Sequence, residues 1–410
     1  MVTQKGDQFI VGRKAHNHQA QPGAAVVSKI TASMKEKAAE NVYKSASAIV
    51  TEVLLEHVNS GPCPSLPKMS CLTRATNRFR QKNRPQDPTD LEFELQEDRV
   101  AENFFKADIN VRDRRHFIFA TDEQIHLLSK AKTWYADATF KLCRSPFKQL
   151  FSINAFVKSG EDTKQLPLAF ALMSGRKKRN YKAILQRLKE IVGEVRVDNI
   201  VIDFESAMWG AFRRVFPGIN ITGCLFHWTQ AIWRKVQELG LQTAYANDRN
   251  AHDYIKKLMA LPFLPADRIR EIFDVMKTRA TSQPLSQLVT YIENTWFDNP
   301  NWNETSWSVY MSPIRTNNDV EGWQNAINRR AGGRSGLPFY QLINLLNSEA
   351  QIAHLQVRLV SEGKLRRIQR KKYVALQRRI FKAWDDYSDG EITTEQLLRV
   401  CSHLNGPVTS

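Results

Sequence analysis

The segment VDNIVIDFESAMWGAF, residues 197–212, contains the pattern that decides the fold. Aliphatic residues lead into Asp203 and Glu205, and a helical pattern rich in aromatic residues follows. A short apolar run that ends in turn or cap residues is typical of a buried strand feeding a helix. Asp203 at the end of such a strand is compatible with a helix cap, a metal ligand or an ordinary surface charge.

Strands and helices alternate on both sides of this segment. Short connections join three apolar runs, at 133–143, 149–160 and 165–175, and such connections suit antiparallel strands. A helical pattern at 179–193 then ends at Gly193, and NITGCLFHW (220–228) adds another strand before a further helix. This order predicts an α/β fold with a mixed five-stranded sheet covered by helices on both faces.

Composition divides the rest of the chain into regions. The N-terminal part has a strand-like segment, then a helical stretch at about 27–58 and a polar linker. The part after the sheet is helical throughout. Near the end, a basic amphipathic helix places its apolar residues on one face. We therefore expect a short N-terminal segment at 1–25, a helical N-terminal region and linker at 26–113 and the first part of a core domain at 114–242. An all-helical insertion at 243–312, the final helix region of the core at 313–350 and a basic helical C-terminal region at 351–410 follow.

The 410 residues carry a net charge of +17, with an isoelectric point near 9.7. Such a charge favours a polyanionic partner, and nucleic acid is favoured over a membrane because no apolar run approaches the roughly 20 residues of a spanning helix. A basic protein without such a partner is the alternative. The five scattered cysteines indicate a reducing compartment, and the N-terminus lacks the apolar core of a signal peptide, so a cytosolic or nuclear location is expected.

Two aspartates occupy strand positions of the expected sheet. Asp137 lies within the strand TWYADATF, and Asp203 ends the later strand. If these strands are neighbours, the two carboxylates meet at one edge of the sheet, where they repel each other unless a divalent cation neutralises them. Mg²⁺, which prefers hard oxygen ligands, fits such a pair. The spacing alone leaves capping and turn formation open.

Four motifs in order give this pattern a family resemblance. They are ADATF around Asp137, VIDFESAM around Asp203, GCLFHW at 223–228 and TNNDVEGWQNAIN at 316–328. Together they resemble the Mutator-like element (MULE) DDE transposases over about 115–345. The resemblance implies an RNase H-like core, interrupted by an all-helical insertion before the last acidic residue.

The resemblance also implies roles for three acids. Asp137, Asp203 and Glu321 correspond to a catalytic, metal-binding triad that holds two Mg²⁺ or Mn²⁺ ions. The implied activity is DNA cleavage at terminal inverted repeats and strand transfer into target double-stranded DNA, by a homodimer or higher oligomer in the nucleus. The alternative is a domesticated DNA-binding or transcription-regulating protein that keeps the fold without transposition. A ribonuclease or another RNase H-like nuclease fits the insertion less well.

Acids and possible ligands near these motifs have competing interpretations. Glu205 is expected to open the helix after Asp203, and Asp319 to lie in a first helical turn, where an acid favours the helix dipole. Cys224 and His227 lack the second pair of ligands that a zinc site needs. They are a buried thiol and a capping histidine, or, as the resemblance implies, an accessory motif that positions DNA or the nearby acids.

The histidines of KAHNHQAQ, His16 and His18, resemble the terminal ligands of a FLYWCH or WRKY-like zinc finger. Such a finger needs two upstream cysteines, and the fifteen residues before His16 contain none. Residues 1–25 are therefore expected to be a truncated remnant that does not bind zinc.

Clusters of basic residues follow the third apolar run, end the helix of Glu321 and begin the C-terminal helix. Such clusters serve nuclear import or phosphate contact. We expect them to bind DNA, and the candidate residues are Arg176, Lys177, Lys178, Arg179, Arg329, Arg330, Arg366, Arg367, Arg370, Lys371 and Lys372.

Overall fold

A computed structural model describes residues 2–5, 8–11, 22–41, 44–58, 63–160, 162–316, 318–365 and 371–404. The chain divides into two compact units, Met1–Gln86 and Asp87–Ser410. Each unit has its own cluster of buried apolar side chains. In the described segments, no helix is long and apolar enough to span a lipid bilayer.

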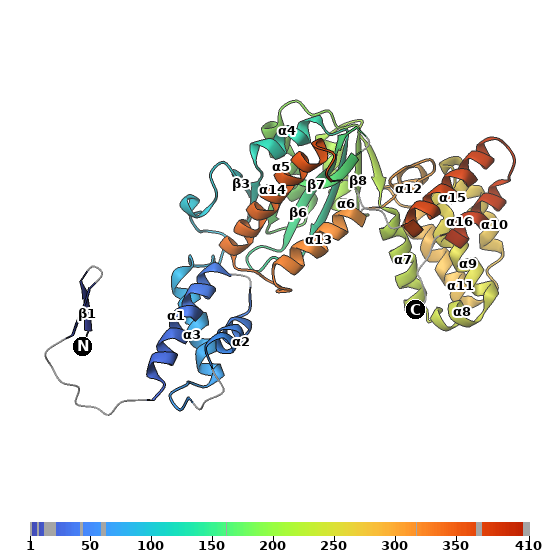
Figure 1. Cartoon of the computed structure of the whole chain (residues 1–410). Helices are drawn as coiled ribbons and strands as arrows, with labels where there is room; N and C mark the ends of the chain where they lie inside the picture. Colours follow the sequence, from blue (N-terminus) through green and yellow to red (C-terminus); the bar gives the residue numbers. More distant parts are fainter. Residues whose placement is uncertain are drawn as a thin grey trace. The chain divides into compact units, whose positions relative to one another are not determined.

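The first unit contains a β-hairpin and a bundle of three helices (Figure 1). The hairpin pairs β1 (Val2–Lys5) with β2 (Gln8–Val11), and the helices are α1 (Ala24–Glu40), α2 (Ala46–His57) and α3 (Met69–Asn83). Ile30, Met34, Ile49, Val50, Val53 and Leu72 form the centre of the bundle. The helical stretch expected at about 27–58 is thus two helices, and α3 follows it inside the region 26–113, where we expected helices and a linker.

The second unit is built on a mixed sheet of seven strands in the order β3-β4-β7-β6-β5-β8-β9. The strands are β3 (Phe105–Val111), β4 (Arg114–Phe119), β5 (Thr133–Thr139), β6 (Gln149–Ser159), β7 (Asp162–Met173), β8 (Asn199–Ile202) and β9 (Asn220–Gly223). The β5–β8 and β8–β9 pairs are parallel, and the other pairs are antiparallel.

The mixed α/β architecture is confirmed, but the expected number of five strands is wrong. The hairpin of β3 and β4 extends the sheet because β4 pairs with β7. β3 does alternate between apolar and polar residues, with apolar side chains at Phe105, Ala107, Ile109 and Val111, and sequence reasoning overlooked this signal. The sequence of β4 contains an apolar run, but its position in the sheet depends on pairing with β7, about 50 residues later in the chain.

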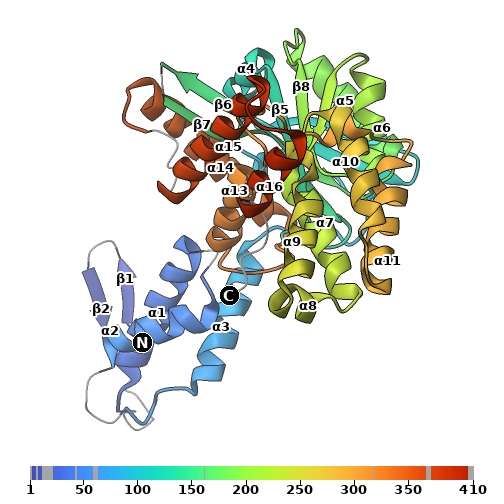
Figure 2. The ribbon, with the colours of Figure 1, turned by 90° about the vertical axis from the view of Figure 1, so that its right-hand side faces the viewer.

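Helices cover both faces of the sheet (Figure 2). On one face, α5 (Lys178–Val192) and α6 (Ser206–Val215) pack on apolar side chains of the strands, among them Trp134 and Ala136 of β5. On the other face lie α13 (Asn318–Arg330) and α14 (Phe339–Ser361). The short helix α4 (Asp122–Lys130) begins at Thr121 with a capping box and contacts β7.

The helical part of the second unit is inserted between β9 and α13. Its helices are α7 (Leu225–Glu238), α8 (Gln242–Asn247), α9 (Arg249–Ala260), α10 (Ala266–Thr278), α11 (Gln283–Ile292) and α12 (Glu304–Trp307). The C-terminal helices α15 (Lys371–Ser388) and α16 (Thr394–Leu404) join this group, and α16 packs against α9 and α10 (Figure 1). The Trp384 side chain is fully buried there and donates a hydrogen bond to the carbonyl of Phe263 at 2.9 Å.

Aromatic rings connect the insertion to the sheet directly behind Asp203. The ring of Phe204 contacts those of Trp296 and Trp302, with centroid distances of 4.5 and 5.4 Å. Trp228 of α7 stacks on Trp307 at 4.6 Å. Because Phe204 follows Asp203 directly, the packing of these rings also fixes the backbone on which the carboxylate stands.

The Phe204 ring lies over Gly223 so closely that no larger residue fits there. A Cβ atom at Gly223 would meet the ring at 2.0 Å. We expect Gly223→Ala to lower the free energy of unfolding by about 1 to 3 kcal/mol, the usual cost of overpacking. Urea denaturation measures this change. The matched control is Gly322→Ala in α13, where a Cβ atom meets nothing within 4 Å and the helix should gain about 0.5 to 1 kcal/mol. Equal stabilities of the two variants would contradict this description.

Candidate active site

Asp137 and Asp203 are brought together by the parallel pairing of β5 and β8. Ala136 of β5 stands opposite Ile202 of β8, so the two aspartates, one residue further along, are neighbours at the same edge of the sheet. Adjacent strands lie about 4.8 Å apart, and side chains in register point to the same face. The expectation that these two carboxylates meet at one edge of the sheet therefore agrees with the observed register.

The face on which the aspartates lie is the face covered by α13. Tyr135 and Val201, two residues before the aspartates, pack with Val320 of α13 in a small apolar cluster. Glu321 follows Val320 and is half-buried. One turn further, Gln324 donates a hydrogen bond from Nε2 to Oδ2 of Asp137 at 3.0 Å. This contact between α13 and β5 was not anticipated from the sequence.

The orientation of α13 is fixed by a buried carboxylate on α14. Glu349 is 2 % exposed and accepts a hydrogen bond from Nε1 of Trp323 at 2.8 Å. It also forms an ion pair with Arg330. On the sheet side, the Trp323 ring stacks on Phe170 at 5.8 Å. These contacts hold α13 against α14 on one side and against the sheet on the other. The turn that carries Glu321 and Gln324 therefore faces the aspartates.

His227 supplies a positive charge next to Asp203. The amide of Cys224, which precedes α7, donates to the carbonyl of Ile202 at 3.1 Å and so places the first turn of α7 beside the end of β8. Nδ1 of His227 lies 2.6 Å from Oδ1 of Asp203. The two atoms do not meet the angle of an aligned hydrogen bond, so the contact is best described as an ion pair.

The ion pair determines the protonation of the imidazole. Burial alone would lower the pKa of His227, but the contacts with Asp203 and then Cys224 outweigh burial and raise the pKa to about 11. His227 is therefore charged at neutral pH. Of the two interpretations of the Cys224 and His227 motif, this contact favours the positioning of a nearby acid.

The acids share one electrostatic environment. Burial and then the charge of Asp203 raise the pKa of Asp137 from 3.8 to about 7, and Glu321 adds a smaller effect in the same direction. Burial and Asp203 also raise the pKa of Glu321, whereas the charge of His227 opposes the rise at both residues. Three carboxyl groups from β5, β8 and α13 are therefore close enough to repel one another.

The chemistry of these groups fits a divalent cation. Oε1 of Glu321 is buried and accepts no hydrogen bond from the described residues, although buried oxygens normally do, and Oδ1 of Asp203 lies beside the charged His227. Carboxylate oxygens are the ligands that Mg²⁺ prefers. Within the described part of the chain, no three His, Cys, Asp or Glu side chains already form a ready metal-ligand cluster. A cation at Asp137, Asp203 and Glu321 would replace the charge compensation that His227 provides here and the hydrogen bond that Gln324 donates to Asp137.

The two competing acids stand at the starts of α6 and α13. Glu205 stands immediately before α6, as expected, and its Oε2 accepts a hydrogen bond from the Tyr181 hydroxyl of α5 at 3.1 Å. Burial raises the pKa of Glu205, and the Tyr181 hydrogen bond opposes the rise. Asp319 lies in the first turn of α13, also as expected.

A basic groove lies at the same edge of the sheet. It has a volume of about 470 Å³ and is lined by Lys177, Lys178, Arg179 and Lys182 at the start of α5, and by Arg214 of α6. α5 follows β7, which is parallel to β5 because both pair antiparallel with β6. The start of α5 therefore lies at the carboxyl ends of these strands, whereas the aspartates face α13 on the other side of the sheet.

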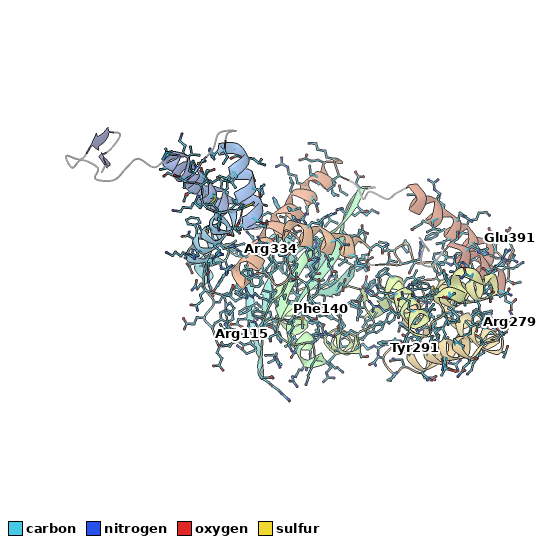
Figure 3. The ribbon with its side chains drawn as sticks, turned by 90° about the horizontal axis from the view of Figure 1, so that it is seen from below. Arg115, Phe140, Arg279, Tyr291, Arg334 and Glu391 are labelled. Carbon is cyan, nitrogen blue, oxygen red and sulfur yellow. The ribbon has the colours of Figure 1, made fainter. Side chains whose placement is uncertain are left out.

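Sequence reasoning missed Lys182 and Arg214 in this groove. Lys182 stands four residues after Lys178 on one helix, and this spacing could have marked the shared face. The contribution of Arg214 depends on the packing of α6 against α5, which no local signal reveals. Beside the groove, Arg176 places its guanidinium 4.8 Å from the ring of Phe140, a half-exposed residue just beyond β5 (Figure 3).

The other candidate DNA-binding residues have different surroundings. Arg329 is exposed at the end of α13, whereas the guanidinium of Arg330 is engaged by Glu349. Arg366, Arg367 and Arg370 lie outside the described residues, and so do His16 and His18 of the expected zinc-finger remnant. Lys371 and Lys372 begin α15, but their side chains are not described.

The fold and this site define an α/β domain with carboxylates from two parallel strands and an added helix at one edge of a mixed sheet. Residues 133–231 match the MULE transposase domain. The match extends from the start of β5 into α7, so it contains Asp137, Asp203 and His227 but ends before Glu321. No curated protein matches the chain.

The raised pKa of Asp137 means that its ionised carboxylate lowers the stability of the folded protein. Between its ordinary pKa of 3.8 and about 7, the folded protein holds a proton that the unfolded chain releases, so stability falls as the pH rises through this window. We expect Asp137→Asn to raise the thermal midpoint in EDTA at pH 8 by about 2 °C or more, with a smaller difference at pH 5. The exposed Asp198→Asn is the control and should change little at either pH. A variant less stable than the wild type at pH 8 would contradict the charge assignment.

Proposed function

We propose that the chain is a MULE-type DDE transposase, or a protein derived from one, whose RNase H-like core cuts DNA strands and transfers them. The observation that carries the proposal is the side-by-side placement of Asp137 and Asp203 on parallel strands, inside the segment that matches the MULE transposase domain. Glu321 is the proposed third acid, since it is electrostatically coupled to both aspartates through the packing of α13.

The proposed site would hold two Mg²⁺ or Mn²⁺ ions through Asp137, Asp203 and Glu321, and these ions would activate the attacking oxygen and stabilise the leaving oxygen. The residues around the acids orient them. Gln324 holds one oxygen of Asp137, and Trp209 donates a hydrogen bond to the backbone carbonyl of Asp203 at 2.7 Å. His227 keeps a positive charge beside Asp203 and limits its repulsion with Asp137.

The proposed substrate is double-stranded DNA, both at the terminal inverted repeats and at the target. The basic groove supports this proposal because Lys and Arg that neutralise phosphates provide sequence-independent affinity. Most of the groove lies at the start of α5, at the carboxyl ends of the strands, and we propose that one duplex reaches from the groove around this edge of the sheet to the acids. Assembly as a homodimer or higher oligomer and action in the nucleus are parts of the same proposal.

The second candidate function is DNA binding without transposition. The observation that favours it is that the basic side chains lining the groove are not part of the cluster of Asp137, Asp203 and Glu321. Such a groove would bind DNA whether or not strands are cut. The two functions therefore differ in metal-dependent cleavage and agree in salt-dependent binding.

The experiment that tests the proposed function measures nicking of supercoiled plasmid DNA by the full chain with Mg²⁺ or Mn²⁺. Loss of a group that only orients a metal ligand costs about 10- to 100-fold, so loss of a proposed ligand in Asp203→Asn should reduce cleavage by more than about 100-fold. Asp198→Asn, the same substitution at an exposed position before β8, should leave cleavage unchanged.

DNA binding, measured by fluorescence anisotropy in EDTA, separates the two candidate functions. Asp203→Asn should bind like the wild type, whereas Lys178→Gln/Lys182→Gln should bind more weakly with a flatter salt dependence. Metal-dependent cleavage that survives Asp203→Asn would contradict the transposase proposal. Wild-type binding through the groove without cleavage in either metal would instead support the second function.

A further inference from the structure

Helix α3 of the first unit presents a polar and basic face to solvent. The exposed residues along this face recur every three or four positions, so they form one stripe along the helix. They are Cys71, Arg74, Asn77, Arg78 and Gln81. The helix contains no acid, and Lys68 and Lys82 stand exposed near its two ends.

The opposite side of α3 is fixed to the other two helices. Leu72 is buried in the core of the bundle, where Phe79 also packs, and Thr76 is 2 % exposed. Arg80 donates hydrogen bonds to the backbone carbonyls of Ala38 at 3.2 Å and Lys44 at 2.8 Å, and also to that of Asn41. Because apolar packing and the hydrogen bonds of Arg80 both anchor this side, the exposed stripe is held on a rigid helix.

The acids of the bundle lie on α1 and α2 and are partly neutralised there. Lys37 forms ion pairs with Glu52 and Glu56, and Lys44 pairs with Glu52. In the part of the chain that the structure describes, neither Arg74 nor Arg78 has a carboxylate partner. The positive charge of the stripe is therefore available to an external polyanion.

We propose that α3 reads the sequence of duplex DNA from the major groove. This groove, about 12 Å wide, admits one α-helix. Arg pairs bidentately with guanine, and Asn and Gln pair with adenine, so Arg74, Asn77, Arg78 and Gln81 are suited to base edges. Positions 74 to 81 span about 10 Å of helix, or roughly three base pairs. Lys68 and Lys82 would contact phosphates on either side. This binding requires neither metal nor catalysis.

The stripe fits other partners less well. A membrane surface would require large apolar residues beside the basic ones, and within the stripe there are none. A protein partner would require an apolar centre with a polar rim. A duplex suits the observed combination, because guanidinium and amide groups pair with base edges and the absence of acids avoids repulsion with phosphates.

The test selects duplexes from a random pool with the full chain in EDTA. The wild type should enrich a sequence motif, and Arg74→Ala/Arg78→Ala should lose it and bind the enriched duplex about 10-fold or more weakly. The matched control is Lys29→Ala/Lys35→Ala, which removes the same charge from exposed positions of α1 and should keep the motif. Asp203→Asn should also keep it, so failure of the catalytic proposal and failure of this one are distinguishable.

Protection of Cys71 gives a second and independent readout. Cys71 is the one cysteine of the five that is exposed, and it lies on the stripe. The enriched duplex should slow its alkylation by N-ethylmaleimide. The proposal is overturned if no duplex motif is enriched, if the two double variants lose affinity equally, or if the bound duplex leaves Cys71 alkylation unchanged.

Discussion

The parallel register of β5 and β8 is the constraint on which the candidate site depends. A shift by one residue would turn every side chain of one strand to the opposite face, and Asp137 would then point toward α5 and α6 instead of α13. The register places two like charges side by side, which is unfavourable in a buried environment. His227 and Gln324 reduce this cost from α7 and α13, so the site depends on segments about 90 residues or more along the chain from Asp137.

The helical insertion and the third acid are linked through packing rather than through sequence proximity. The chain leaves the sheet after β9 and returns at α13, and the rings around Phe204 and Trp228 hold the insertion against the end of β8. The returning helix is then oriented by Glu349, whose buried carboxylate would be costly without its Trp323 and Arg330 partners. The position of Glu321 therefore depends on two sets of contacts, the aromatic cluster around Phe204 and the packing of α13 against α14.

The sequence predicted what depends on local pattern. The apolar runs identified the central strands, Gly193 ended α5 as expected, and the strand positions of Asp137 and Asp203 predicted their meeting at one edge. Sequence reasoning overlooked β3 although its apolar residues alternate with polar ones, and it placed no separate helix at α3, whose apolar face is narrow. The contacts of Gln324 and Arg214 could not be predicted, because they arise only when helices far apart in the sequence pack together.

The most direct test of the central claim is a crystal structure of the full chain with Mn²⁺, in which anomalous scattering locates the ions. The account predicts anomalous peaks within about 2.5 Å of carboxylate oxygens of Asp137 and Asp203, with Glu321 completing the site. It also predicts that Gln324 or His227 releases its carboxylate partner when the ions are bound. Anomalous peaks elsewhere on the chain, with the three acids still bound only to protein groups, would contradict the account.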